Sequence, residues 1–100
     1  MDFKEKCYNL VKKVPKGKIT TYKEIAEALG TKGYRAVGNA LNNNPNLVVV
    51  PCHRVVKSNG EVGGYAEGIE RKIELLKKEG IPIENNMIIN FEKHFFRFKK

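Results

Sequence analysis

The chain has 100 residues, of which 41% are hydrophobic and 30% charged, as in a single globular domain with one modest core. No apolar run approaches the roughly 18 residues of a membrane span, and the N-terminus lacks the apolar segment of a signal peptide, so we expect a cytoplasmic protein. A formal charge of +8 favours a polyanionic partner, with nucleic acid first and an acidic membrane surface second.

Apolar residues at the start of the chain recur with helical spacing. A capping-box pair, Asp2 and Glu5, opens this helix, and Pro15-Lys16-Gly17 ends it. The apolar stripe consists of Phe3, Cys7, Leu10, Val11 and Val14. Because Cys7 lies on the stripe, we interpret it as a core residue without chemistry.

Two short helices follow, joined by a glycine-containing turn. Thr21 and Glu24 form a second capping box that opens a helix through about Leu29, and a third helix runs from about Tyr34 to Asn43. This arrangement is typical of a helix-turn-helix. The outer face of the third helix carries one arginine, small residues and amides, which suit close approach to DNA better than a solvated surface. The expected DNA-binding residues are Arg35, Ala36, Gly38, Asn39 and Asn42.

The second half of the chain predicts short strands and one more helix. The apolar run Leu47–Val50 is expected to be buried, and residues 55–63 resemble a small hairpin with a glycine turn. A fourth helix spans about Gly68 to Glu79, with Ile69, Ile73 and Leu76 facing inward. Residues 81–83 and 87–89 form a second candidate strand pair. The fold class is therefore mainly α (α+β), a small winged-helix-like domain with a short β-hairpin.

Cys52 stands between Pro51 and the pair His53-Arg54, directly after the apolar run. Only a thiolate is a strong nucleophile, and neighbouring cations and an imidazole are the groups that activate it. A buried, inert cysteine beside two surface residues is the alternative for this tetrapeptide alone. Cys7 and Cys52 are expected to be free thiols in a reducing cytosol. No Cys and His group has zinc-ligand spacing, so we expect no metal and no cofactor.

The wider pattern resembles one family. Asn44-Pro45, then Pro51-Cys52-His53-Arg54-Val55-Val56, then Gly63-Gly64-Tyr65 are together similar to the active-site region of the O6-alkylguanine-DNA alkyltransferases. The resemblance extends from about Phe3 to Gly80 and includes Arg35-Ala36-Val37-Gly38 of the third helix.

The resemblance implies DNA repair by direct reversal of damage. Cys52 would take the alkyl group, typically methyl, from guanine O6 in a single displacement that spends the protein. His53 would act as the base through a water, Glu79 would orient His53, and Asn44 would hold the network.

The resemblance also implies the contacts to the substrate. Tyr22 would donate to guanine N3, and the Val55 carbonyl would accept from the guanine amino group. Tyr65 and Leu41 would wall the pocket. Ala66 stands where a serine is common in the family, so a hydroxyl contact near O6 is missing.

The implied partner is double-stranded DNA that contains O6-alkylguanine, with O4-alkylthymine as a second candidate lesion. Arg35 would enter the duplex and fill the gap left by the flipped nucleotide. We expect a monomer with no membrane partner. Residues 1–85 would form the alkyltransferase DNA-binding and active-site domain, and residues 86–100 a basic, solvated C-terminal extension.

Three alternatives stand beside this interpretation. The first is an alkyltransferase-like lesion sensor that recruits other repair machinery without reacting, but such proteins usually replace the cysteine that is retained here as Cys52. The second is a basic helix-turn-helix regulator, which would bind with sequence-dependent affinity. The third is a thiol hydrolase, for which the sequence has no separate substrate-binding signature.

Overall fold

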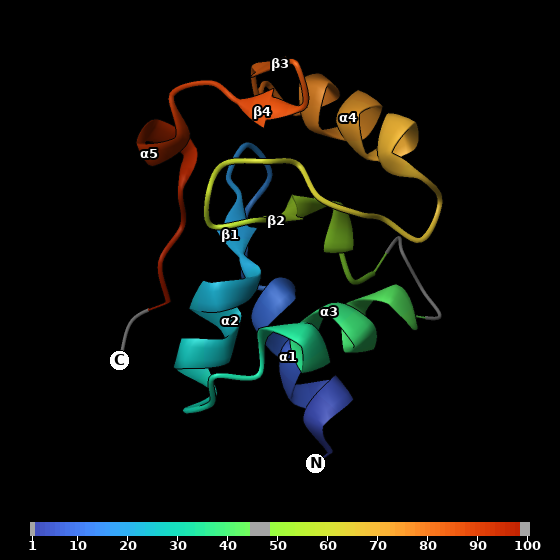
Figure 1. Ribbon diagram of the computed structural model, residues 1–100, viewed down its shortest axis with the longest axis vertical. Coiled ribbons are helices and arrows are strands. Elements are labelled where there is room, and N and C mark those ends of the chain that lie inside the picture. The colour runs from blue at the N-terminus through green and yellow to red at the C-terminus, as the bar shows by residue number, and fades with distance from the viewer. Residues whose placement is uncertain (1, 45–48, 99–100) are drawn as a thin grey trace.

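Three helices form one end of the molecule, which Figure 1 shows at the bottom. The computed structural model describes residues 2–44 and 49–98. Helices α1 (Phe3–Val11), α2 (Tyr22–Ala28) and α3 (Tyr34–Asn42) pack on one another around a shared apolar core. Asp2 and Thr21 cap α1 and α2, each accepting an amide N–H three residues later at 2.9 Å. Both predicted caps and the predicted helix-turn-helix are confirmed.

A small parallel strand pair joins this end to the rest of the chain. Strand β1 (Thr20–Thr21) lies beside β2 (Val55–Val56), with Thr20 opposite Val55. A short 3-10 helix, η1 (Cys52–Arg54), leads directly into β2. The pairing therefore brings the segment that contains Cys52 against the start of the helix-turn-helix.

The predicted hairpin over residues 55–63 is wrong in its pairing. Its turn exists, because the Lys57 amide donates to the Glu61 carbonyl at 2.9 Å. However, β2 pairs with β1, and Glu61 forms its β-bridge with Met87, so the two predicted arms do not form a ladder with each other. A glycine turn has a local sequence signal, whereas pairing between short strands far apart in the sequence has none. The sequence therefore revealed the turn but not the pairing.

The opposite end consists of α4 (Ile69–Lys78) and an antiparallel hairpin, β3 (Ile83–Glu84) and β4 (Met87–Ile88). Asn85 and Asn86 join the strands with φ of 51° and 63°, as a two-residue type I′ turn requires. The predicted pairing of residues 81–83 with 87–89 is confirmed in part, because the strands that pair are residues 83–84 and 87–88. A second apolar cluster lies here and includes Leu76, Ile81 and Ile88.

Burial departs from the predicted pattern at three places. Ile69, predicted to face inward, begins α4 and is 38% exposed, while Lys72, which was not among the predicted inward residues, is 0% exposed. Val50 is buried as predicted, but Val49 is 54% exposed, and residues 47–48 lie outside the described part of the chain. A hydropathy pattern places every charge outside, so it misses a cation that finds backbone acceptors inside.

The C-terminal segment returns along one side of the molecule from β4 to α2 (Figure 1). It contains α5 (Phe91–His94), and it pairs with Ile19: the Ile19 N–H donates to His94 at 2.9 Å and Phe96 donates to Ile19 at 2.7 Å. Phe91 packs against the second cluster and Phe98 against the first. The segment is thus packed through residue 98 rather than solvated. The expected boundary at residue 85 falls in the Asn85–Asn86 turn. The division of the chain into residues 1–85 and 86–100 stays a prediction.

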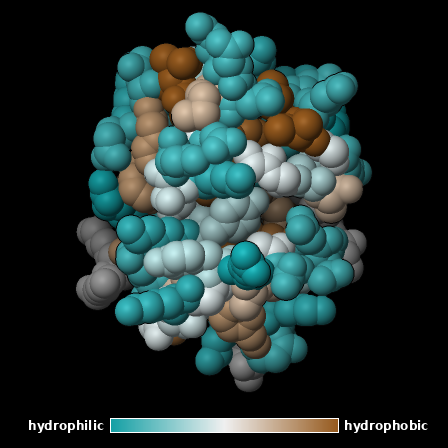
Figure 2. All heavy atoms as spheres, viewed as in Figure 1, coloured by the Kyte–Doolittle hydropathy of each residue, from teal (hydrophilic) through white to brown (hydrophobic). Residues whose placement is uncertain are grey.

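The surface seen in Figure 2 is mostly hydrophilic. Its hydrophobic side chains gather in small patches, chiefly toward the end that contains α4, β3 and β4. Within residues 2–44 and 49–98, no helix is long and apolar enough to cross a membrane.

Truncation after Asn90 should lower the free energy of unfolding by about 2–4 kcal/mol, because it removes the packed phenylalanines and both hydrogen bonds to Ile19. Urea denaturation measures the change. Lys93→Ala, an exposed substitution in the same segment, should change stability by no more than about 0.5 kcal/mol. Equal stability of the truncated and full-length chains would contradict a structural role for the segment.

Candidate active site

The Cys52 side chain is held from two sides at the seam between the two ends of the molecule. Asn44 lies two residues after α3, and its Nδ2 donates to Cys52 Sγ and to the Val50 carbonyl, each at 3.0 Å. Sγ in turn donates to the Leu41 carbonyl at 3.7 Å. The structure therefore brings Asn44 and Cys52 together and links the helix-turn-helix directly to the cysteine.

The two cysteines differ in their polar surroundings. Burial raises the pKa of the Cys52 thiol, while the Asn44 hydrogen bond and the charge of Lys72 oppose that rise. Cys7 is 0% exposed in the helical core, and burial together with nearby Cys52 raises its pKa to about 11. A thiol in apolar surroundings is inert. Polar partners that favour a thiolate thus distinguish Cys52.

His53 is buried and uncharged at neutral pH. Its Nε2 lies 3.0 Å from Glu79 Oε2. Burial lowers the pKa of His53 despite the opposing influence of Glu79. An ionised carboxylate only accepts, so Nε2 carries the proton and Nδ1 keeps a free lone pair. Within the described part of the chain, Nδ1 is buried and has no hydrogen-bond partner, so it is the basic atom of this ring.

Glu79 is fixed by Arg54 as well as by His53. Arg54 Nε donates to Oε1 at 3.0 Å, Nη2 donates to Oε2 at 2.7 Å, and Nη1 donates to the Val14 carbonyl at 2.9 Å. Burial alone would raise the pKa of Glu79, but these hydrogen bonds outweigh it and hold the pKa below its ordinary value. Glu79 caps the C-terminus of α4, where a carboxylate opposes the helix dipole. Arg54 offsets that opposition.

The role of Arg54 was missed by the sequence analysis, although a signal existed. A glutamate in the last turn of a helix is unfavourable unless a cation compensates it. Arg54 lies in the motif that already supplied Cys52 and His53. Pairing Glu79 with this arginine would have followed from the unfavourable position of Glu79.

A cavity of about 520 Å³ opens beside His53. Tyr65 stands edge-on to His53, with ring centroids 6.4 Å apart, and both rings line the cavity. The Tyr22 hydroxyl lies 3.5 Å from the carbonyl of Gly64, the residue before Tyr65. Neither Cys52 nor Tyr22 lines the cavity, so it is not by itself the expected base pocket.

The other expected substrate residues lie as follows. The Leu41 side chain packs in the first core cluster, and its carbonyl faces the thiol. The Val55 side chain is buried, and its carbonyl accepts from Lys72 Nζ at 2.6 Å. Ala66 is exposed. Lys72 itself was not expected at the site; burial lowers its pKa to about 7, and Cys52 opposes that shift.

The outer face of α3 is open. Arg35, Ala36, Asn39 and Asn42 are exposed, and Gly38 is half-buried. A Cβ added at Gly38 would meet nothing within 4 Å, so packing within the chain does not require glycine there. Because glycine costs a helix about 1 kcal/mol relative to alanine, its presence favours close approach by a partner.

The family model for the 6-O-methylguanine DNA methyltransferase DNA-binding domain matches residues 2–81. The chain belongs to this methyltransferase family. The expectation from sequence is thus confirmed for the family and for the fold class.

One curated family member, from Saccharolobus islandicus (strain L.S.2.15 / Lassen #1), is named a methylated-DNA--protein-cysteine methyltransferase. It is 49% identical over 81 residues, which are 81% of this chain and 52% of that protein. The chain spans about half the length of the curated relatives it matches.

Two solved structures are similar to this methyltransferase-family chain. S. pombe Atl1, in complex with damaged DNA containing O6-carboxymethylguanine, has a TM-score of 0.84 at 30% identity and covers 95% of this chain and 94% of its own. Mycobacterium tuberculosis OGT in complex with DNA has a TM-score of 0.75 at 41% identity and covers 79% of this chain and 50% of its own.

Arg54→Met should lower the free energy of unfolding by about 3 kcal/mol, because Glu79 then remains buried without the Arg54 hydrogen bonds. Arg71→Met is the matched control: its ion pair with Glu74 is exposed on α4, so the change should stay within about 0.5 kcal/mol. Urea denaturation of both variants measures the difference. Equal losses would mean that burial of the Arg54 pair is unimportant.

Proposed function

We propose that this chain repairs O6-alkylguanine in double-stranded DNA by transferring the alkyl group, once and irreversibly, to Cys52. The observation that carries the proposal is the pairing of a held thiol with a prepared base. Asn44 fixes the Cys52 sulfur, and ionised Glu79 leaves neutral His53 with a free Nδ1. An inert core cysteine such as Cys7 has no such partners.

The reaction is a single displacement. His53 Nδ1 takes the proton of the Cys52 thiol through a water, and the thiolate attacks the alkyl carbon on O6. The S–C bond forms as the C–O6 bond breaks, and the electron pair stays with the guanine. Burial and the charge of Cys52 raise the pKa of Tyr22 to about 12, so its hydroxyl remains protonated and can donate to guanine N3. The thioether product is stable, so each molecule acts once.

Duplex DNA is the partner that the charge and the α3 face support. The net charge of +8 suits sequence-independent phosphate contacts. Arg35 has no hydrogen bond or ion pair to the described residues and is free to enter the duplex when the base flips out. O4-alkylthymine is a second candidate lesion. We further propose an intracellular monomer.

Lesion recognition without transfer is the second candidate. Atl1 matches over nearly its whole length, whereas the chain spans half of the curated methyltransferases. Retention of Cys52 with Asn44, His53 and Glu79 favours transfer over recognition alone.

Mixing the protein with a duplex that contains O6-methylguanine should add about 14 Da, one methylene, to its intact mass. Peptide mapping should place the gain on Cys52, with Cys7 as the internal control. Cys52→Ser should take up nothing but still bind the duplex. Tight binding of the damaged duplex without mass gain would overturn the transfer and make the chain a lesion sensor.

Arg35→Ala should slow methyl transfer from the duplex at least about tenfold, because base flipping costs a few kcal/mol that Arg35 offsets by filling the gap. Transfer from the free O6-methylguanine base should be unchanged. Lys78→Ala removes one charge from α4, at the end opposite α3, and should affect neither substrate (Figure 1). Similar losses on both substrates would contradict the flipping role.

A further inference from the structure

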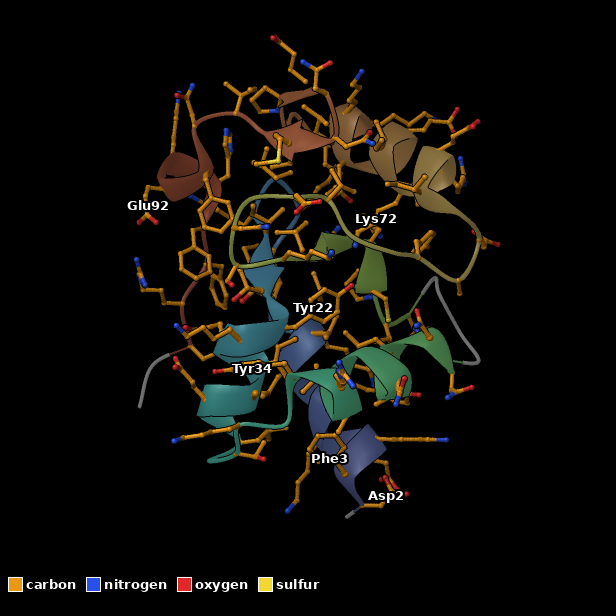
Figure 3. All side chains as sticks on the ribbon, viewed as in Figure 1. Asp2, Phe3, Tyr22, Tyr34, Lys72 and Glu92 are labelled. Atoms are coloured by element: carbon orange, nitrogen blue, oxygen red, sulfur yellow. The ribbon has the colours of Figure 1, made fainter. Side chains whose placement is uncertain are left out.

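Lys72 is a lysine buried in the interior, at 0% exposure, on the face of α4 that turns toward β2. Its Nζ donates to the Val55 carbonyl at 2.6 Å and to the Gly64 carbonyl at 3.0 Å. It also lies 5.8 Å from the centre of the Tyr22 ring; Figure 3 labels both side chains. An ammonium has three N–H donors, and two carbonyls and one aromatic face match that number.

These partners suit an amino group better than an apolar side chain of the same size. Burying an ammonium is strongly unfavourable unless its hydrogen bonds are made, and a leucine or methionine would fill the same position of α4 without that cost. Both hydrogen bonds go to backbone carbonyls instead of a carboxylate. The charge therefore joins two segments of backbone.

The two joined segments border the expected base pocket. Val55 begins β2, directly after the η1 helix that carries Cys52 and His53. Gly64 lies in the loop that presents Tyr65 to the His53 ring. The Tyr22 hydroxyl lies 3.5 Å from the Gly64 carbonyl, so this loop and Tyr22 are in contact as well.

We propose that Lys72 is a positioning residue that fastens the Gly63–Tyr65 loop to β2 and thereby holds Tyr22 and Tyr65 at the separation that the target base requires. The inference rests on the proposed alkyl transfer for its purpose, but not for its geometry. Lys72 does not touch the alkyl group; it acts through the loop that it holds.

Two variants separate the contributions of Lys72. Lys72→Met keeps the length and removes the donors, while Lys72→Arg keeps charge and donors. Lys78→Met, an exposed substitution on the same helix, is the matched control. Hydrogen exchange of residues 61–67 is measured by mass spectrometry, with α1 as the internal reference.

In Lys72→Met, exchange in the loop should rise at least about tenfold while exchange in α1 stays unchanged. Methyl transfer from an O6-methylguanine duplex should fall at least about tenfold, because a displaced loop would no longer orient the target base toward the Cys52 thiol. The affinity for the undamaged duplex should be unchanged. Lys72→Arg should restore part of the loop protection and of the transfer rate. Lys78→Met should match the wild type.

Unchanged loop exchange in folded Lys72→Met would overturn the proposal. Faster exchange in the loop and α1 alike would also overturn it, because that result describes general destabilisation. If neither variant folds, the proposal is tested on the wild-type protein by NMR. Scalar coupling should be detected from Lys72 Nζ to the Val55 and Gly64 carbonyl carbons, and absence of this coupling would overturn the proposal. If the wild type accepts no methyl group, the proposed function fails while loop exchange still tests the fastening.

Discussion

The ionised carboxylate of Glu79 is the interaction on which the rest of the site depends. It accepts from His53 and, through both oxygens, from Arg54, whose Nη1 donates to the Val14 carbonyl beyond α1. Glu79 thus joins α4 to η1, and Arg54 extends the link to the connector after α1. Glu79 also determines which nitrogen of His53 carries the proton, and so which nitrogen can act as a base.

The site lies at the seam between two small apolar clusters rather than inside either one. From the helix-turn-helix end, Asn44 reaches Cys52; from the α4 end, Glu79 reaches His53 and Lys72 reaches Val55. Each end supplies part of the chemistry, so the relative position of the two ends is itself a functional parameter. Helix α3 ends two residues before Asn44, which holds the Cys52 thiol, so a partner bound to α3 would lie only a short stretch of backbone away from the thiol.

Local chemistry was predictable from the sequence, and distant pairing was not. The caps at Asp2 and Thr21 and the stripe of α1 depend on residues three or four apart, and the cysteine motif was specific enough to indicate the family. The buried position of Lys72 was missed because its acceptors are backbone carbonyls, and no pattern of side chains in the sequence predicts such contacts. The β1–β2 pair and the packed C-terminal segment depend on contacts across tens of residues, and the sequence carries no periodic sign of either.

The pairing of Ile19 with residues 94–96 also constrains the order in which the protein folds during synthesis. Domains emerge from the ribosome N-terminus first, yet the backbone partners of Ile19 are His94 and Phe96. The helices can form early, because their contacts are local. Strand β1 has to wait for β2, and the adjoining Ile19 has to wait for residues 94–96. The nascent chain can therefore complete this part of its structure only after residues 94–96 have left the ribosome.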